Sequence, residues 1–270
     1  MIDKNRDFLY QYLLHAPIPL AVERALECDI YSSKDFKRPV LDIGCGEGLF
    51  AHVLFEGKVD VGIDPNESEL RRAGMYGRYN ELIRCFGNKI PKPDGHFQTV
   101  ISNSVLEHIE DLEPVLREAY RLLADGGRFY ATVPTNMFER YNVVYQICQL
   151  VGLKGPGDSF RRFFNRFWKH YHCYEPARWQ AIFEKSGFQV IEIVEYDPKS
   201  IAILNDALVP FSILGFLNKK AFNRWILIQG LRKLYIGPVY FLIKRFIERN
   251  KNGQRGGIVF FILTKEQVNS

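Results

Sequence analysis

The sequence predicts an α/β fold in which helices cover both faces of a parallel sheet. From residue 39 onward, short apolar runs alternate with amphipathic stretches of ten or more residues, a pattern typical of βα units. The chain of 270 residues, of which 47% are hydrophobic, is long enough for one large α/β domain. This composition excludes a disordered chain, a collagen-like chain and a disulfide scaffold.

The predicted elements follow in order along the chain. Strands are expected at 39–43, 58–63, 81–85, 99–102 and 128–133, which makes a doubly wound sheet. A helix begins at residue 111 or 112 and is predicted to end at the pair Gly126 and Gly127, because glycine readily adopts the left-handed backbone that ends helices. After residue 134 a helix at 176–186 and strands at 188–196 and 258–264 complete the pattern.

Two interruptions of this pattern define the expected domain organisation. We predict one domain over residues 1–270, made of a helical lead-in at 1–38, a core at 39–135, an aromatic and basic lid insertion at 136–174, a basic apolar helical insertion at 200–255, and a last strand and tail at 256–270. The lid has its apolar groups at helical spacing. Its apolar face is expected either to pack on the sheet edge or to contact an acceptor or a membrane.

The most informative segment is the stretch VLDIGCGEGLF, residues 40–50. An apolar strand ends near Asp42, and Gly44, Gly46 and Gly48 follow at alternate positions before a helix. Glycines at such a turn let a ligand lie against the backbone because no Cβ stands in the way. A dinucleotide fingerprint has its third glycine one residue later, and the acid disfavours pyrophosphate. A cationic ligand is therefore favoured over a turn without ligand.

A second acid, Asp64, follows the second predicted strand, twenty residues after Gly44. In doubly wound folds a carboxylate in this position accepts hydrogen bonds from ribose hydroxyls. The alternative role for Asp64 is that of a helix N-cap. The two acids together are consistent with a nucleoside that carries positive charge, and S-adenosylmethionine, with its ammonium and sulfonium groups, is such a molecule.

Further motifs accompany these two acids. They are Gly62-Ile63-Asp64, DGHFQTV at 94–100, SVLEHI at 104–109, RLLADGG at 121–127, TVP at 132–134, and a late helix and strand within 174–196. With these motifs the sequence resembles the class I S-adenosylmethionine-dependent methyltransferases, in particular the methyltransferase type 11 family. The resemblance implies a Rossmann-like, mainly parallel sheet of seven strands, with the last strand antiparallel.

The same resemblance implies a set of cofactor-binding residues. They are Asp42, Gly44, Cys45, Gly46, Gly48, Asp64, Pro65, Gly87, Asn88, Asn103 and Ser104. Asp42 is expected to orient the ammonium through backbone or water, and Asp64 to hold the ribose. The family commonly has an acid next to Gly87 and Asn88, and this chain has none there.

Methyl transfer requires little of catalytic side chains, because alignment of nucleophile, methyl and sulfur supplies most of the acceleration. A base is needed only where the acceptor must lose a proton. His108 is the first candidate and His172 the second, and for both a hydrogen-bonding or packing role is the alternative. No metal site is expected, because the five cysteines are scattered and form no Cys-x-x-Cys.

Charge is unevenly distributed along the chain. The net charge is +5, from 36 Lys and Arg against 31 Asp and Glu, but residues 201–255 hold ten basic residues against only Asp206 and Glu248, a net +8. Basic residues that flank apolar helices predict a surface that lies on an anionic membrane. The alternative is a helical pair that packs on the sheet or forms a homodimer contact. We do not expect nucleic acid, because no nucleic-acid module is recognisable.

The cysteine pattern also bears on location. An odd number of cysteines without paired spacing favours reduced thiols, and no secretory signal is recognisable, so we expect a cytoplasmic protein that lies at the membrane periphery if its basic helices bind lipid. A conventional membrane span is not expected, because the apolar stretch 201–217 contains Asn205, Asp206 and Pro210.

These observations predict an enzyme that transfers a methyl group from S-adenosylmethionine to a small-molecule, glycan or lipid-linked acceptor, at oxygen. The basic apolar insertion favours a lipid-linked or otherwise amphiphilic acceptor. The alternative is a protein that binds S-adenosylmethionine without catalysis and serves as a scaffold or regulatory partner.

Overall fold

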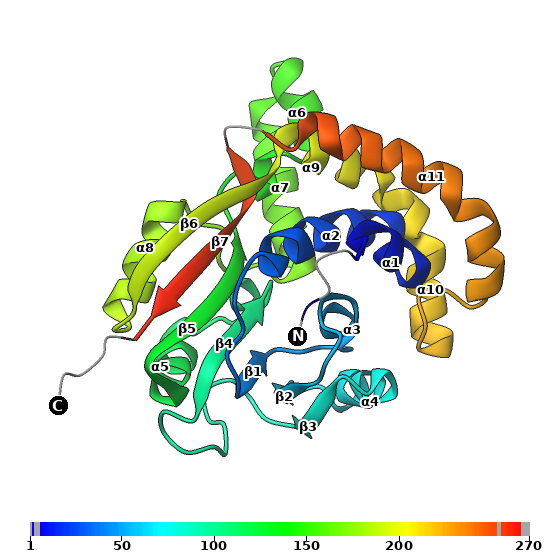
Figure 1. The fold of residues 1–270 in the computed structure, drawn as a ribbon. Helices are drawn as coiled ribbons and strands as arrows, with labels where there is room; N and C mark the ends of the chain where they lie inside the picture. The colour runs from blue at the N-terminus through cyan, green and yellow to red at the C-terminus, as the bar shows by residue number, and fades with distance from the viewer. Residues whose placement is uncertain (1, 3–5, 253–254, 266–270) are drawn as a thin grey trace.

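The computed structural model describes residues 2, 6–252 and 255–265, and these residues contain a single seven-stranded sheet (Figure 1). Its strands are β1 (Val40–Ile43), β2 (Val59–Ile63), β3 (Tyr79–Ile83), β4 (Phe97–Asn103), β5 (Leu123–Pro134), β6 (Gln189–Pro198) and β7 (Gly256–Thr264). The order is β3-β2-β1-β4-β5-β7-β6. Strand β7 runs antiparallel to both of its neighbours, β5 and β6, and the other described pairs are parallel. The predicted mainly parallel sheet and antiparallel last strand are confirmed. Residues 266–270 of the predicted tail lie outside the described residues.

Two hydrophobic cores lie on opposite faces of the sheet. Successive strand residues alternate between them: Val40 faces one and Leu41 the other, and Tyr130 and Phe129 divide in the same way. The first core is covered by α1 (Phe8–His15), α2 (Ile18–Ser32), α3 (Leu49–Leu54), α4 (Glu67–Tyr76) and part of α11 (Gln229–Asn250), the second by α5 (Leu112–Leu122) and α8 (Pro176–Lys185). Burial on both faces explains why the strands read as continuous apolar runs.

Two predicted boundaries are corrected by the structure. The third strand begins at Tyr79 rather than residue 81, because the Tyr79 ring is buried against the first core. Helix α5 ends at Leu122, four residues before the glycine pair, because Leu123 already pairs with Phe97 in the sheet. The glycines lie instead in an irregularity of β5, between this pair and the next one, Thr99 with Arg128.

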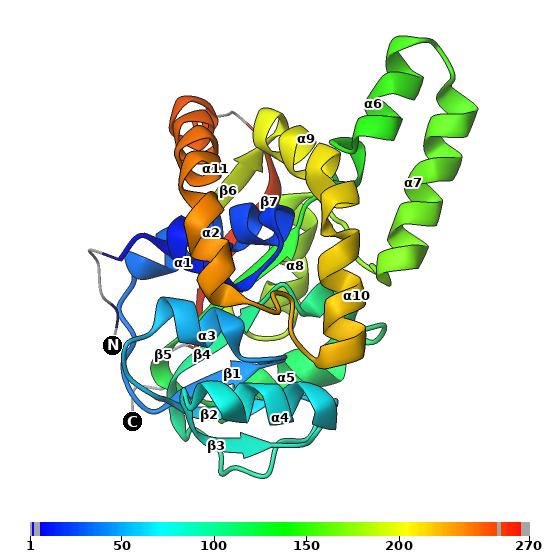
Figure 2. The ribbon, with the colours of Figure 1, turned by 90° about the vertical axis from the view of Figure 1, so that its right-hand side faces the viewer.

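The first insertion forms a helical hairpin that projects from the body of the domain (Figure 2). It contains η2 (Phe138–Arg140), α6 (Val143–Leu150) and α7 (Lys154–Trp168). Within α6 and α7 only Gly157 is buried, so the predicted packing of an apolar lid face on the sheet edge is wrong for these two helices. Ile147, Leu150 and Leu153 at the outer end of the hairpin are more than half exposed.

The second insertion comprises α9 (Lys199–Leu208), η3 (Val209–Ser212), α10 (Ile213–Phe222) and α11. Helix α11 crosses the N-terminal helices (Figure 1), where the buried guanidinium of Arg232 donates to the main-chain oxygens of Leu13 and Ala16 at 2.7 and 2.9 Å. These bonds satisfy carbonyl groups at the end of α1, which have no partner within the helix. One side of the insertion packs on the domain, as the helical-pair alternative expects, and the other side is exposed. Binding of the exposed side to a membrane or to a second copy stays a prediction.

Among the residues that the structure describes, one helical segment is long and apolar enough to cross a membrane, judged by length and composition alone. This segment is Lys199–Phe222, which has 24 residues and a mean hydropathy of 1.8 over its apolar stretch of 18 residues. Of that stretch, 11% is buried inside the protein. A span was not expected in this stretch, because it contains Asn205, Asp206 and Pro210. Asp206 nevertheless accepts hydrogen bonds from Asn142 and the main chain of Val143, both at 2.8 Å, and Ile201 is fully buried. The first half of the segment is therefore part of the packed domain.

Candidate functional site

The glycine loop joins β1 to α3 at the carboxyl ends of the strands. Gly44, Gly46 and Gly48 have φ of 75°, 51° and 75°, in the left-handed region where glycine is favoured. A Cβ on Gly44 would lie 2.5 Å from a methyl carbon of Val105, so this position requires glycine for packing. A Cβ on Gly46 would meet no atom within 4 Å. The backbone of Gly46 therefore faces open space into which a ligand can approach closely.

Asp64 connects the end of β2 to this loop. Its carboxylate accepts hydrogen bonds from the main-chain nitrogen of Gly46 at 3.1 Å and of Asn66 at 2.8 Å. Asn66, rather than Asp64, caps helix α4 by accepting from Ser68 at 2.9 Å. The alternative role of Asp64 as the helix cap is thus not supported, since Asn66 is the cap and the Asp64 carboxylate lines the cavity above the loop.

Asp42 lies beneath the loop rather than in the cavity. Its side chain is 3% exposed and accepts a hydrogen bond from the hydroxyl of Tyr79 at 2.7 Å. Burial raises the pKa of Asp42 to about 7, and the Tyr79 hydroxyl opposes this shift. Asp42 does not line either cavity described below, so its expected action on a ligand is at most indirect. Tyr79 was not predicted as its partner.

The glycine loop forms the floor of a cavity of about 860 Å³, here called the glycine-loop cavity. Apart from Asp42, it is lined by every residue expected to bind the cofactor: Gly44, Cys45, Gly46, Gly48, Asp64, Pro65, Gly87, Asn88, Asn103 and Ser104. The cavity opens where the strand order reverses, between β1 and β4, which is the usual ligand site of doubly wound sheets. The sequence pattern therefore predicted residues that the fold does bring together.

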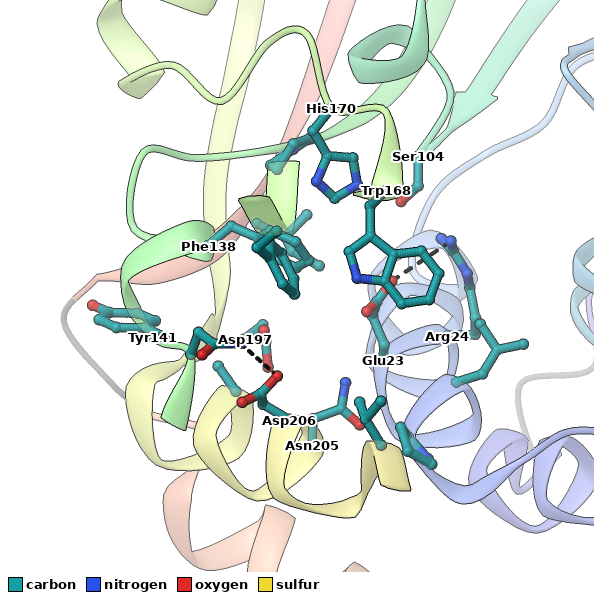
Figure 3. Close-up of a pocket in the computed structure, with 18 of the residues that line it drawn as sticks. Glu23, Arg24, Ser104, Phe138, Tyr141, Trp168, His170, Asp197, Asn205 and Asp206 are labelled. Carbon is teal, nitrogen blue, oxygen red and sulfur yellow. Dashed lines mark hydrogen bonds and ion pairs between the residues drawn. The ribbon is translucent and has the colours of Figure 1, made fainter. Parts of the chain in front are cut away.

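A second cavity of about 350 Å³, here called the aromatic cavity, lies between α2, α7 and α9 (Figure 3). Rings of six aromatic residues line it: Phe138, Tyr141, Phe164, Trp168, Phe216 and Trp225. The two cavities share five lining residues, Leu20, Arg24, Ser104, His108 and Trp225, here called the junction. Both insertions contribute to the aromatic cavity, which the sequence analysis did not place.

Glu27 of α2 organises the junction from below. Its carboxylate is fully buried and accepts hydrogen bonds from Arg24 at 2.8 and 2.7 Å, from Asn103 at 2.7 Å, and from the Ser104 hydroxyl at 3.0 Å. The Tyr196 hydroxyl donates to it at 3.3 Å. Sequence reasoning missed Glu27, although an acid among the apolar residues of a lead-in helix was a signal that could have pointed to it.

Trp225 closes the junction from above. Its indole nitrogen donates to Glu47 at 2.6 Å, and Lys219 contacts the same carboxylate at 3.2 Å. Glu47 stands between Gly46 and Gly48 in the glycine loop, so the second insertion is attached directly to this loop. The insertion is therefore part of the wall of both cavities and not an appendage of the core.

His108 reaches both cavities from η1 (Leu106–His108). Its Nδ1 lies 3.2 Å from the main-chain oxygen of Lys169, and because a carbonyl only accepts, the proton stands on Nδ1. Nε2 is then the basic nitrogen, 3.9 Å from a carboxylate oxygen of Glu107. Partial burial lowers the pKa of His108, which favours the neutral ring.

His172, the second predicted base, is placed differently. Its Nε2 donates to the main-chain oxygen of Ile109 and its Nδ1 accepts from the hydroxyl of Tyr174, both at 2.8 Å. The ring packs beside Trp179 and lines neither of the two cavities. With both nitrogens bonded, His172 has the packing role that was the alternative prediction.

Several carboxyl groups of the aromatic cavity are buried. Burial raises the pKa of Glu107 to about 8 and that of Glu23 to about 6, and it also raises the pKa of Asp197. Glu107 is 4% exposed, and its Oε2 has no hydrogen-bond partner among the described residues. At neutral pH the Glu107 carboxyl therefore holds a proton in the folded protein.

This protonation predicts a pH dependence of stability. Glu107 loses its proton near pH 8 in the folded chain but near its ordinary value of 4.5 when unfolded, so the folded state holds more protons between these values and the free energy of unfolding falls as the pH rises. In Glu107→Gln this loss is absent. Urea unfolding should show the variant gaining about 2–4 kcal/mol on the unmutated chain between about pH 5 and about pH 8. The same change at exposed Glu110 serves as control, and parallel pH profiles would contradict the assignment.

Comparisons with known proteins agree with this geometry. The chain is 26% identical over 174 residues to a mitochondrial ubiquinone biosynthesis O-methyltransferase of Bos taurus, which covers 60% of this chain and 44% of that protein. It is 33% identical over 113 residues to a demethylmenaquinone methyltransferase of Symbiobacterium thermophilum, which covers 38% of this chain and 45% of that protein. The chain thus spans less than half the length of either relative.

The solved structure of an S-adenosylmethionine-dependent methyltransferase from Thermotoga maritima matches the fold. Its TM-score is 0.59 at 16% identity, and the match covers 95% of this chain and 93% of that one. A family model described as a methyltransferase domain matches residues 13–193, which include the glycine loop, Asp64, every junction residue except Trp225, and β6 up to Ile193. The chain therefore belongs to the methyltransferase domain family, with S-adenosylmethionine as its cofactor.

Proposed function

We propose that this enzyme transfers a methyl group from S-adenosylmethionine to a hydroxyl group of an amphiphilic, lipid-linked or similarly apolar acceptor. The observation that carries the proposal is the junction, because Leu20, Arg24, Ser104, His108 and Trp225 line both cavities. A cofactor in the glycine-loop cavity and an acceptor in the aromatic cavity would meet there. Proximity of this kind supplies much of the acceleration in a direct displacement.

The residues of the glycine-loop cavity fit the cofactor. Gly46 leaves open space beside the backbone, and Asp64 stands next to it with a carboxylate that can accept ribose hydroxyls. Pro65, Gly87 and Asn88 line the same cavity on the strand side. When bound, S-adenosylmethionine supplies a methyl group that its sulfonium makes electrophilic. The role of the chain is to bind and orient it and to keep the acceptor at the junction.

The aromatic cavity supports an acceptor with a substantial apolar part. Six aromatic rings line it, together with Pro17, Pro19 and Val209, whereas its volume of about 350 Å³ suits a small molecule or the end of a larger one. The hydroxyl to be methylated would lie at the junction next to His108. Nε2 of His108, the nitrogen without a proton, is the group proposed to accept the hydroxyl proton.

A titration calorimetry experiment tests cofactor binding. We expect the unmutated chain to bind S-adenosylhomocysteine and Asp64→Ala to bind it at least about tenfold more weakly, because a carboxylate hydrogen-bonded to two hydroxyls is lost. Glu67→Ala, an exposed acid three residues along the chain, is the matched control and should bind as the unmutated chain does. No heat from the unmutated chain would contradict the proposal.

Label transfer identifies the acceptor and tests His108. Lipid and metabolite extracts incubated with S-adenosylmethionine carrying a deuterated methyl group should yield one labelled product in mass spectrometry. In His108→Asn the rate should fall by about 10²–10⁴-fold, as expected for loss of a general base, while S-adenosylhomocysteine affinity stays unchanged. His172→Asn is the comparison variant. If His108→Asn retains the full rate, the base is another group.

The second insertion supports a location at a membrane surface. Phe211, Leu214 and Leu234 are 77%, 71% and 81% exposed, and further exposed apolar side chains lie on α10 and α11. The same segment has a net charge of +8. Its exposed apolar side chains are here called the apolar-basic surface together with its exposed basic residues, Lys220, Arg224, Lys233, Arg245 and Arg249. Charge complementarity favours an anionic leaflet over a second copy of this basic segment. An amphiphilic acceptor could then reach the aromatic cavity from the membrane.

Flotation with phosphatidylglycerol and phosphatidylcholine vesicles tests this location. We expect the chain to float with anionic vesicles at low salt and to be released by high salt or by vesicles of phosphatidylcholine alone. Phe211→Ser combined with Leu214→Ser should abolish most of the flotation, whereas Met75→Ser, an exposed apolar residue of α4, should not. A chain that stays with the soluble fraction at low salt, or that dimerises through this surface in sedimentation, contradicts the proposal.

A further inference from the structure

The end of the aromatic cavity away from the junction is polar. Asp197, Asn205 and Asp206 line this end, Ser212 also lines the cavity, and none of the four lines the glycine-loop cavity. In Figure 3, Asp197, Asn205 and Asp206 lie on one side of the cavity, and Trp168 lies apart from them. This end is built from β6 and α9, so it is formed only when the second insertion packs against the sheet.

Asp197 is the most unusual residue at this end. It is 3% exposed, and its Oδ1 has no hydrogen-bond partner among the residues that the structure describes. Its backbone has a φ of 59°, in the left-handed region that few residues other than glycine adopt. A buried carboxyl oxygen without a partner is costly unless a ligand supplies the missing donor.

Two further side chains of the cavity lining, Asn205 and Ser212, carry oxygens in the same condition. Asn205 Oδ1 and Ser212 Oγ also have no hydrogen-bond partner among the described residues. An amide oxygen accepts hydrogen bonds, and a hydroxyl can do so. With Asp197, three side chains that line the cavity therefore present oxygens that a donor-bearing group could satisfy.

The charged side chains that line the aromatic cavity indicate whether the missing donor is cationic or neutral. Glu23, Glu107, Asp197 and Asp206 line the aromatic cavity, and among the lysines and arginines of the described chain only Arg24 does. The guanidinium of Arg24 makes two hydrogen bonds to Glu27, which lines neither cavity, and lies 3.5 Å from Glu23. Its charge is thus matched inside the wall. Among the described lining residues no basic side chain is left for Asp197. Burial raises the pKa of Asp197 and so favours its protonated form, and an ammonium group beside it would favour the ionised carboxylate instead.

The aromatic rings reinforce this preference. Phe138 and Tyr141 line the cavity together with the acids, and ring faces attract ammonium groups through their quadrupoles. His170, which also lines the cavity, brings no positive charge of its own, because burial lowers its pKa to about 4 and leaves it neutral near pH 7. A cavity with carboxyls, aromatic rings and no free basic side chain among its described residues suits an ammonium ion better than a carboxylate or phosphate.

We propose that the acceptor carries a protonated amine, and that Asp197 holds this amine at the far end of the aromatic cavity while the reacting group lies at the junction. This proposal rests on the proposed function, since it assumes that the aromatic cavity is the acceptor site. It adds a second recognition point, which fixes the orientation of an otherwise apolar molecule. An acceptor bound at both ends loses its freedom to slide along the ring-lined wall.

Three ten-carbon probes that differ only in their head group test the proposal: decylamine, decanol and decanoate. Each is titrated calorimetrically into the full chain at neutral pH, below its micelle concentration, with and without saturating S-adenosylhomocysteine. We expect decylamine to bind at least about tenfold more tightly than decanol, and decanoate to bind most weakly. Association with the apolar-basic surface would favour decanoate, so the expected order cannot come from that surface.

Asp197→Asn assigns the preference to one residue. Asparagine tolerates the left-handed backbone and has the same shape, so the variant should fold and keep its affinity for S-adenosylhomocysteine. The advantage of decylamine over decanol should be lost, with decanol binding unchanged. Asp125→Asn, an exposed acid paired with Lys265, is the control. An amine advantage that persists in Asp197→Asn, or equal binding of the three probes to the unmutated chain, overturns the proposal.

The outcome also separates this proposal from the proposed function. If S-adenosylhomocysteine binds and the head group makes no difference, only the amine proposal fails. If the unmutated chain does not bind S-adenosylhomocysteine, the proposed function fails whatever the probes do.

Discussion

The buried carboxylate of Glu27 is the interaction on which the site depends most. It accepts hydrogen bonds from Arg24 on its own helix, from Asn103 and Ser104 at the end of β4, and from Tyr196 near the end of β6. A fully buried charge is tolerated only when hydrogen bonds surround it, and here those bonds come from separate parts of the fold. They fix α2 across the carboxyl ends of the strands, where it forms one wall of both cavities.

The second insertion is attached to the same site by polar contacts of its own. Trp225 and Lys219 attach it to Glu47 in the glycine loop, and Arg232 attaches it to the carbonyls that end α1. The same segment that carries the exposed apolar side chains therefore also closes the junction. This arrangement couples the proposed membrane surface to the proposed acceptor site physically, because one helical unit, α9 to α11, contributes to both.

Local sequence pattern predicted the core well, because its signals are local. Strand periodicity and the glycine spacing reflect which backbone conformations neighbouring residues can adopt, and ten of the eleven expected cofactor residues line one cavity. The sequence did not reveal contacts between residues far apart in the chain. Leu123 leaves its helix early because it pairs with Phe97, Asp42 turns to Tyr79, and both nitrogens of His172 are bonded to Ile109 and Tyr174.

The sequence by itself determined the fold class, the order of βα units and the loop that faces the cofactor, since each is encoded in residues close together along the chain. Only the tertiary structure decided the aromatic cavity. Its walls come from α2, the end of β6, and both insertions, and Glu27 and Tyr196, which meet beneath it, stand 169 residues apart. No periodic pattern records a meeting of segments so far apart, because it results from how the helices pack on the finished sheet.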